Sequence, residues 1–415
     1  MKSKYKRLGP YIQQVDIRNK ADKRDNLLGV SVTKEFIKSI ANTVGTDFTK
    51  YKIVRKNQFT YIPDTSRRGD KIAIALLENE EEGLVSQAYT VFEVSDTDSL
   101  LPEYLMMWFR RPEFDRYARF KSHGSVREIF NWEDMCEVEL PIPPIKEQRK
   151  LVKEYNVIRD RIRLNSQLIQ NLGGIAKAIY EQWFVDFEFP DKNGITYKSN
   201  GGNMKYNDEL DMEIPLEWEV KPLSDLCIIK GGKRLPKGED LNNDGDGIPY
   251  IKVADMCDSK FISLNNSFQY VEKDIQKKIA NYIVSTGDLI VSIVGTIGLV
   301  NIVEKSLNNA NLTENCVKLT DFKSINSDYL YQFLSSSTGQ RIIDTLIVGG
   351  VQGKLPIYNI KSIPVLCPDI STLNRFTETI APINSLIMNY TSQTNKLSEL
   401  KDLLLSKLVI KEESL

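Results

Sequence analysis

Residues 151–183 read LVKEYNVIRDRIRLNSQLIQNLGGIAKAIYEQW. Apolar side chains recur through this stretch in alternating steps of four and three, and only Asn165 interrupts the stripe. This alternation is typical of a helix that buries one narrow seam against another helix. At 1.5 Å per residue, a helix from Ile145 to Trp183 would be roughly 60 Å long. We therefore expect a long helix with the seam residues Leu151, Ile158, Ile162, Ile169, Leu172, Ile179 and Trp183.

A similar stripe returns about 225 residues further on, starting at Phe376. It predicts a second long helix, and the two helices are expected to pair as a coiled coil. The second stripe is less regular, because Thr394 and Lys401 lie on the seam and Pro382 is near its start. A kink or a late helix start is therefore expected there. The seam residues of this helix are Ile383, Ile387, Leu397, Leu404 and Leu408.

The segments that precede the two stripes share short motifs in the same order. The matched motifs are Lys6-Arg-Leu-Gly with Lys221-Pro-Leu-Ser, Arg68-Gly-Asp-Lys-Ile with Thr286-Gly-Asp-Leu-Ile, Pro102-Glu-Tyr-Leu with Ser327-Asp-Tyr-Leu, His123-Gly-Ser-Val-Arg with Val348-Gly-Gly-Val-Gln, and Ile129-Phe-Asn with Ile357-Tyr-Asn. Each match is weak alone, but their common order indicates two copies of one fold.

The expected fold is mixed α/β (α+β). It has two similar globular domains separated by an antiparallel coiled coil of two long helices, with an internal pseudo-two-fold repeat. Short apolar runs at residues 71–77 and 89–94 are typical of strands, and a helix is expected at residues 103–118. The predicted domains are 1–143, the first globular domain; 144–189, the first long helix; 190–215, a linker; 216–368, the second globular domain; and 369–415, the second long helix.

Composition is that of a globular protein with several domains. The 415 residues are 41% hydrophobic and 27% charged, and this length exceeds one ordinary core. The longest apolar run, residues 289–300, is shorter than a membrane span requires. Five scattered cysteines include no CxxC pair, and no apolar core follows the charged N-terminus. We therefore expect a reducing, cytoplasmic location and no secretory signal.

The sequence lacks the motifs of common catalytic sites. It has one histidine, His123, which excludes a two-histidine metal site. It has no GxxxxGK[ST] loop to bind phosphates and no Asn-Pro-Pro-Tyr or Asp-Pro-Pro-Tyr loop for methyl transfer to a base. We therefore predict no catalytic residue and no metal site in this chain.

Basic residues cluster in loops beside glycine. Residues 230–238 read KGGKRLPKG, with four cations on a backbone that can approach a ligand closely. Arg and Lys on such loops suit phosphate contact and the reading of guanine, although solvated surface is an equally open interpretation for any single cluster. The residues predicted to contact DNA are Arg67, Arg68, Lys121, Ser125, Arg127, Lys230, Lys233, Arg234, Lys237, Thr296, Gln352 and Lys354.

Several motifs closely resemble the specificity subunits of type I restriction–modification systems. Leu140-Pro-Ile-Pro-Pro-Ile-Lys-Glu-Gln148 precedes the long helix, which ends at Trp183-Phe-Val-Asp-Phe-Glu-Phe-Pro. Tyr197-Lys-Ser-Asn-Gly-Gly follows, and Gly287-Asp-Leu-Ile-Val-Ser lies in the second domain. The resemblance covers essentially the whole chain. It departs at the second helix start, where Cys367-Pro-Asp-Ile-Ser-Thr-Leu replaces the Pro-Pro-Ile-Lys-Glu-Gln motif.

The resemblance implies a noncatalytic subunit with two target recognition domains, each reading one half of a bipartite double-stranded DNA site. It also implies assembly with two modification (methyltransferase) subunits, and with restriction/translocase subunits in the full complex. S-adenosylmethionine, ATP and Mg would then bind those partner subunits and not this chain. Two other interpretations stay open, a self-contained restriction or modification enzyme and a coiled-coil scaffold without DNA recognition.

Overall fold

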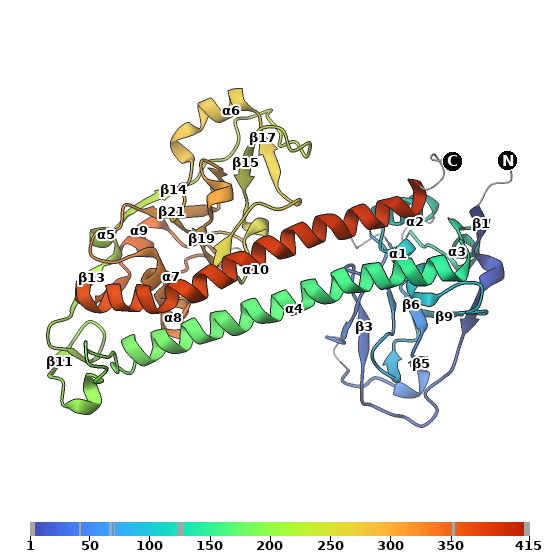
Figure 1. Cartoon of the computed structure of the whole chain (residues 1–415), viewed down its shortest axis with the longest axis horizontal. Helices are drawn as coiled ribbons and strands as arrows, with labels where there is room; N and C mark the ends of the chain where they lie inside the picture. Colours follow the sequence, from blue (N-terminus) through green and yellow to red (C-terminus); the bar gives the residue numbers. More distant parts are fainter. Residues whose placement is uncertain are drawn as a thin grey trace. The chain divides into compact units, whose positions relative to one another are not determined.

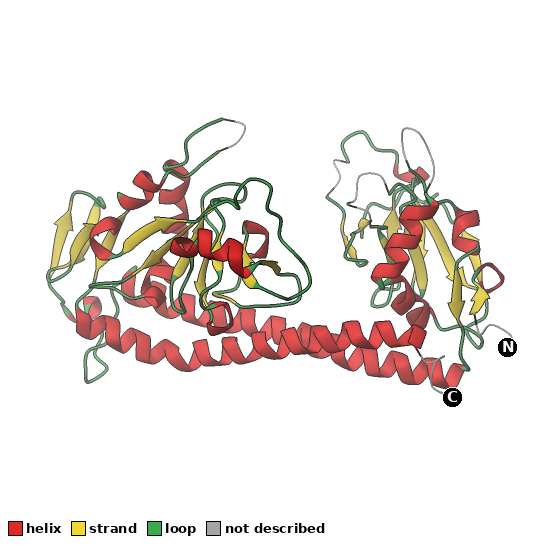
Figure 2. Cartoon of the chain, turned by 90° about the horizontal axis from the view of Figure 1, so that it is seen from above, coloured by secondary structure: helices red, strands yellow, loops and turns green. Residues whose placement is uncertain are grey.

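The computed structural model of the protein describes residues 5–40, 43–65, 69, 71–122, 128–350 and 353–410. The chain forms two compact units, of which unit 1 comprises Met1–Arg161 and Leu397–Leu415 and unit 2 comprises Ile162–Lys396. Each unit mixes helices with strands (Figures 1 and 2). Within the described ranges, no helix combines the length and the apolar character that crossing a membrane requires.

Unit 1 is built on a four-stranded antiparallel sheet in the order β2-β9-β6-β7, and β1 pairs with β10, β3 with β4, and β5 with β8. Phe109 of α1 meets Phe59 of β6 edge-on, with ring centroids 5.7 Å apart, so α1 packs on this sheet. The strands are β1 (Tyr5–Arg7), β2 (Ile12–Val15), β3 (Leu28–Val30), β4 (Phe36–Lys38), β5 (Lys52–Arg55), β6 (Gln58–Tyr61), β7 (Ile74–Leu76), β8 (Glu82–Val85), β9 (Thr90–Val94) and β10 (Glu139–Pro141). The short helices are α1 (Pro102–Phe109), α2 (Pro112–Lys121) and α3 (Trp132–Cys136).

Unit 2 is built on a five-stranded sheet in the order β14-β21-β18-β19-β16, beside a three-stranded sheet in the order β17-β15-β20. Two further pairs are β11 with β12 and β13 with β22. The strands are β11 (Met204–Asn207), β12 (Met212–Pro215), β13 (Glu219–Pro222), β14 (Ile228–Gly231), β15 (Ile248–Ile251), β16 (Phe261–Ile262), β17 (Gln269–Val271), β18 (Leu289–Ser292), β19 (Val300–Val303), β20 (Asn311–Leu312), β21 (Cys316–Thr320) and β22 (Pro364–Cys367). The short helices are α5 (Leu223–Leu226), α6 (Lys273–Lys278), α7 (Ser327–Ser335), α8 (Ser337–Thr345) and α9 (Ile357–Lys361).

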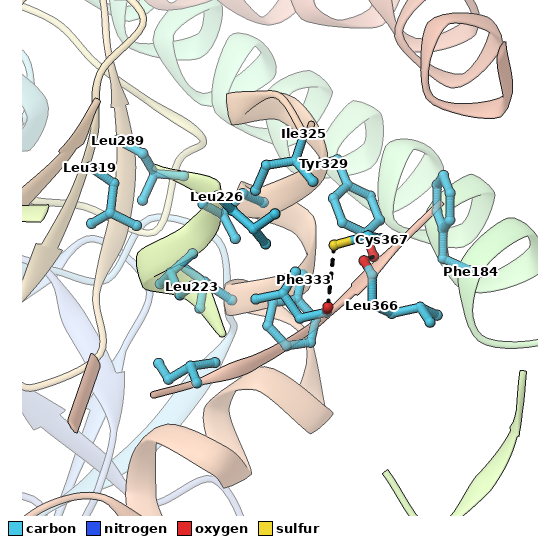
Figure 3. Close-up of a cluster of buried hydrophobic side chains, with 14 of the residues drawn as sticks. Phe184, Leu223, Leu226, Leu289, Leu319, Ile325, Tyr329, Phe333, Leu366 and Cys367 are labelled. Carbon is cyan, nitrogen blue, oxygen red and sulfur yellow. Dashed lines mark hydrogen bonds between the residues drawn. The ribbon is translucent and has the colours of Figure 1, made fainter. Parts of the chain in front are cut away.

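The two units repeat one scaffold, which confirms the predicted internal repeat. The strand order β2-β9-β6-β7 corresponds to β14-β21-β18-β19. Helices α1 and α7 lie at corresponding places in the two units, and the first tyrosine of each makes the same kind of hydrogen bond. Tyr104 of α1 donates its hydroxyl hydrogen to the Pro141 carbonyl (3.0 Å), and Tyr329 of α7 donates to the Leu366 carbonyl (2.6 Å; Figure 3). Both bonds tie a helix to the last strand of its globular part, because Pro141 ends β10 and Leu366 lies in β22.

Two of the predicted motif matches are wrong in register. Thr286-Gly-Asp precedes β18, which is bonded to two neighbours and corresponds to β6, whereas Arg68-Gly-Asp precedes β7 at the edge of its sheet. A Gly-Asp pair can precede any strand, so this motif does not identify the strand that follows it. Likewise, Ile129 bridges Asp64 as Lys354 bridges Val294, so Ile129 corresponds to Lys354 and not to Ile357.

The Lys6/Lys221 match and the Pro102/Ser327 match are in register. Leu8 donates its N–H to the Val138 carbonyl (2.8 Å), and Leu223 donates to the Ile363 carbonyl (2.9 Å). The match of residues 123–127 with residues 348–352 lies mostly outside the described residues. These two motif matches therefore still support the repeat.

The long helices are α4 (Ile145–Phe184) and α10 (Ile370–Ile410), and each contributes residues to both units. In unit 1, Tyr155 of α4 shares a core with Leu405 and Leu408 near the end of α10. In unit 2, Trp183 near the end of α4 meets Phe376 near the start of α10, with ring centroids 5.9 Å apart. The helices are therefore antiparallel. The seam residues, all buried or half-buried, are Leu151, Ile158, Ile162, Ile169, Leu172, Ile179, Trp183, Ile383, Ile387, Leu397, Leu404 and Leu408.

The stripes also pack on the globular parts and not only on each other. In unit 2, Ile387 is buried with Phe261 and Ile302, and Ile169 packs against the same cluster. Asn165, the polar interruption, is fully buried, and its side-chain amide donates to Gln393 Oε1 at 3.4 Å. A buried polar residue on a helix seam favours one register over others.

The expected late start of the second helix is wrong. α10 begins at Ile370 and continues to Ile410 with Pro382 inside it. Proline removes one backbone hydrogen bond and disfavours a helix interior by about 3 kcal/mol. The residues before it, Leu373, Phe376 and Ile380, are buried in the unit 2 core, and this burial offsets the cost. The predicted kink at Pro382 stays a prediction.

Candidate nucleic-acid interface

Three loops of unit 2 leave the same end of the five-stranded sheet. β18 ends at Ser292, which pairs with Cys316 at the start of β21, and the last residue of β14, Gly231, pairs with Val317. Because these strands are antiparallel, the loop after β14, the loop after β18 and the loop before β21 all emerge at one end. We call these loops, with the hairpin described next, the loop cluster.

The fourth member is the hairpin between Val348 and Lys354. These two residues exchange backbone hydrogen bonds, each 2.9 Å long. Lys354 also bridges Val294, and Leu355 donates its N–H to the Ile293 carbonyl (3.0 Å). The structure therefore brings the Lys354 hairpin beside the loop that carries Thr296, whose carbonyl accepts a bond from Ser292 Oγ (2.6 Å). Gln352 lies outside the described residues.

The loop after β14 is held close to its neighbours by backbone contacts. A Cβ on Gly232 would come within 1.9 Å of the Thr313 carbonyl oxygen, so only glycine fits this position. Lys233 donates its N–H to the Leu312 carbonyl (2.8 Å), and its own carbonyl accepts from the Tyr250 hydroxyl (2.7 Å). The Lys233 ammonium lies 5.8 Å from the centre of the Tyr282 ring. Glycine in this loop was predicted to let the backbone approach a ligand closely. Gly232 instead lets the loop backbone pack against the Thr313 carbonyl of the same chain.

Arg234, the next residue, is paired with Glu314. Its Nε–H donates to Glu314 Oε1 at 2.6 Å, while 79% of the Arg234 side chain remains exposed. Burial acts to raise the pKa of Glu314, but the bond from Arg234 holds that pKa below its usual value. The same bond raises the pKa of Arg234. The pair therefore stays charged, with the guanidinium held along one edge.

The loop after β14 and the loop before β21 line a cavity of about 570 Å³. Arg234 and Lys237, both predicted, are part of its lining. The sequence analysis missed the other polar residues there, which are Glu239, Tyr250, Lys252, Thr313 and Asn315. The run Thr313-Glu-Asn315 between two strands was the only available signal, since polar residues at a strand boundary indicate a loop.

Lys230 lies apart from the loop cluster. It is an exposed residue of β14, the edge strand, and it pairs across the ladder with Lys318 of β21. Residues directly opposite in an antiparallel pair point to the same face. Lys230 therefore presents its charge from a face of the sheet and not from the end where the other predicted residues gather.

In unit 1, the predicted contacts Arg67, Arg68, Ser125 and Arg127 lie outside the described residues. The residues that flank them are held together. Thr65 donates its N–H to the Glu128 carbonyl (3.0 Å) and its hydroxyl hydrogen to Ser122 Oγ (2.9 Å). Thr65, Ser122 and Glu128 therefore lie together at the place that corresponds to the Thr296 and Lys354 loops of unit 2. Lys121, half-buried at the end of α2, lies next to this point.

The thiols of unit 2 are not poised as nucleophiles. Burial raises the pKa of Cys227 and of Cys316 to about 12, and a thiol at neutral pH is then a poor nucleophile. Within the described ranges, no three His, Cys, Asp or Glu side chains are grouped to hold a metal ion. The loop cluster offers cations, amides and hydroxyls, which suit binding to phosphates and base edges.

Comparison with known proteins gives a consistent family. The type I restriction modification DNA specificity domain matches residues 4–173 and 215–400. The MjaIX type I restriction enzyme specificity subunit of Methanocaldococcus jannaschii is 27% identical over 333 residues, which are 76% of this chain and 70% of that protein. The HindI specificity subunit of Haemophilus influenzae is 24% identical over 377 residues, covering 79% of this chain and 80% of that protein.

One solved structure shares the fold. It is the type I restriction–modification S subunit from M. genitalium, with a TM-score of 0.53 and 14% sequence identity. The alignment covers 97% of this chain and 95% of that chain. The similarity therefore extends over both globular parts and both long helices.

Proposed function

Since the chain belongs to the family of type I restriction modification DNA specificity domains, we propose that it reads the DNA target of a type I restriction–modification complex. Each globular part recognises one half of a bipartite double-stranded site. The antiparallel helix pair sets the number of base pairs between the halves. Packed helices suit this task because two globular parts that read one face of B-DNA must keep a separation of about 34–36 Å or a multiple of it.

The loop cluster of unit 2 is the observation that supports this proposal most. It gathers Lys233, Arg234, Lys237, Thr296 and Lys354 at one end of a rigid sheet. The scaffold that holds it recurs in unit 1, where Thr65 and Glu128 are bonded at the corresponding place. A repeated scaffold with separate loop sets allows two different half-sites to be read, because loops carry the residues that vary.

In this proposal the chain itself catalyses no reaction. Two modification subunits transfer methyl groups from S-adenosylmethionine, and restriction/translocase subunits use ATP and Mg in the full complex. The chain contributes DNA recognition and the surfaces on which those partners assemble. The absence of a methyl-transfer loop and of a nucleotide-binding loop from the sequence supports this division of labour.

Methylation assays on defined DNA test the proposal. The purified chain should be inactive alone, and it should direct methylation to one bipartite sequence when the modification subunit encoded with it is added. Methyl transfer by the chain alone would refute the noncatalytic assignment.

A domain exchange tests the two-reader arrangement separately. Replacing residues 1–143 by those of a family member with another target should change one half of the methylated sequence and leave the other half intact. A change in both halves would contradict independent reading. Shortening both helices by matched heptads should alter the spacer and preserve the bases that are read.

A further inference from the structure

Arg234 differs from the other cations predicted to contact DNA in unit 2. In the part of the chain that the structure describes, it alone among Lys230, Lys233, Arg234, Lys237 and Lys354 is bonded to a carboxylate. We propose that Arg234 reads a guanine in the major groove of the half-site bound by unit 2, and that Glu314 is its positioning residue. This assignment rests on the proposed function and goes beyond it by naming a base and a side-chain pair.

The backbone that carries Arg234 is fixed. Gly232 fits against the Thr313 carbonyl without room for a Cβ, and Lys233 is bonded through both its N–H and its carbonyl. Arg234 therefore begins from a defined position, although its side chain is exposed. A fixed backbone lowers the entropy lost when the side chain binds a ligand.

The guanidinium is held in a way that leaves a recognition edge. Its Nε–H is bonded to Glu314 Oε1, and Glu314 Oε2 in turn accepts from Thr313 Oγ1 at 3.0 Å. Thr313 is buried, with 6% of its surface exposed, so it anchors the carboxylate. Among the described residues, no partner is bonded to the two Nη groups of Arg234. These two groups form the planar fork that matches guanine O6 and N7.

Charge favours a base edge over a phosphate at this position. The Glu314 carboxylate lies beside the guanidinium and would repel a phosphate that approached it. Lys237 lines the same cavity and has no hydrogen-bond or ion-pair partner among the described residues, and a compact ammonium suits phosphate contact. Exposed Arg–Glu pairs contribute little to stability, so holding the fold is a weak explanation for the pair. The loop therefore offers Lys237 for contact with a phosphate and the oriented guanidinium of Arg234 for contact with a base edge.

Methylation of a randomised DNA library by the chain with its modification subunit tests the assignment. Arg234→Lys keeps the charge and removes the fork. Its preference for guanine at one position of the unit 2 half-site should fall by about 5- to 150-fold. The unit 1 half-site should be unchanged, and this half serves as an internal control for a folded complex. Glu314→Gln should reduce the same preference by a smaller factor at the same position.

Lys237→Ala is the matched control on the same loop. It should lower methylation of all sequences alike, reduce the salt dependence of binding, and leave the bases read unchanged. If Arg234→Lys behaves like this control, or leaves the guanine preference unaltered, or if the half-site contains no G·C pair, the assignment of Arg234 is wrong. A wild-type complex without any sequence preference would instead overturn the proposed function itself, so the two failures are distinguishable.

Discussion

The two long helices start in different ways, although they occupy matching places in the repeat. At the start of α4, Gln148 is fully buried and donates to the carbonyls of Ser99 (2.9 Å) and Pro143 (2.8 Å). It also accepts from the N–H of Leu101 (2.9 Å), just before α1. One side chain therefore ties the helix start to the globular part of unit 1.

The start of α10 is capped locally. Asp369 accepts from the N–H of Thr372 (2.9 Å) and from its hydroxyl (2.7 Å), both within the first turn. The hydrogen bonds to the globular part of unit 2 begin in the second turn, where Asn326 donates to Thr377 Oγ1 (2.8 Å), and continue along the helix. Asn384 donates to Asp328 of α7 (3.0 Å), and the buried Lys260 ammonium contacts both Asp328 (2.5 Å) and Asn384 (2.9 Å).

This difference explains how the second helix can lose the Pro-Pro-x-x-Glu-Gln motif and still form. The motif supplies a tertiary anchor through its glutamine, whereas α10 has an N-cap and, further along, Asn384 bonded to the Lys260–Asp328 ion pair. The motif is therefore one solution to fixing a helix on its domain and not a requirement for the helix itself. Removing each anchor separately tests this interpretation.

The largest effect is expected at the Lys260–Asp328 ion pair, to which Asn384 of α10 is bonded. Asp328→Ala would leave the Lys260 ammonium buried without its counter-charge, which should destabilise unit 2 by about 3–5 kcal/mol. Denaturant unfolding monitored in unit 2 measures this loss. The double variant Asp328→Ala with Lys260→Met should recover most of the stability, because no uncompensated charge remains. Equal loss in the single and double variants would show that the unpaired Lys260 charge is not the cause of the destabilisation.

Gln148→Ala should be the next most damaging change. It removes three hydrogen bonds made by a buried side chain and leaves two part-buried carbonyls and one N–H without that partner, which should cost about 2–4 kcal/mol. Gln148→Glu keeps the acceptor for Leu101 and loses both donated bonds, so its cost should also be large. A loss no greater than that of Asp369→Ala, about 1 kcal/mol for an N-cap, would contradict the contrast between the two helix starts.

The tyrosine bonds that the two units share should be equal in effect. Tyr104→Phe and Tyr329→Phe each remove one hydroxyl bond to a strand carbonyl, with an expected loss of about 0.5–1.5 kcal/mol in each case. Thermal unfolding of the two single variants measures both. Similar losses would extend the repeat from topology to energetics, and a clear inequality would show that only one unit depends on this bond.

The features that could be predicted best from the sequence were those that repeat over a few neighbouring residues. The 4-3 stripe is local, so both helices could be predicted, including the buried Asn165. The role of Glu314 could not be predicted, because it lies 80 residues from Arg234. The two residues meet only through the pairing of β14 with β21, and the partner of a strand depends on long-range contacts that one sequence does not reveal. The match between the two Gly-Asp motifs was wrong because this short motif carries no information on which strand follows it.

The smallest predicted effect uses pH, because the N-cap of α10 is a carboxylate whereas the side chain that anchors α4, Gln148, is an uncharged amide. Burial acts to raise the pKa of Asp369, but the bonds from the Thr372 hydroxyl and N–H hold that pKa below its usual value. A carboxylate with a lowered pKa in the folded state stabilises that state above its unfolded pKa of about 3.9, and the contribution is lost as pH falls through the folded value. The first turn of α10 should therefore loosen in acid before the first turn of α4, since Gln148 carries no titrating group.

Hydrogen exchange of the Thr372 amide, compared between pH 5 and pH 3 with that of the Leu101 amide, measures the difference after correction for intrinsic rates. Asp369→Asn should remove most of the pH dependence at Thr372. If the Leu101 amide lost protection equally in the same acid range, a common unfolding step would account for the change and the two helix starts would not be distinct.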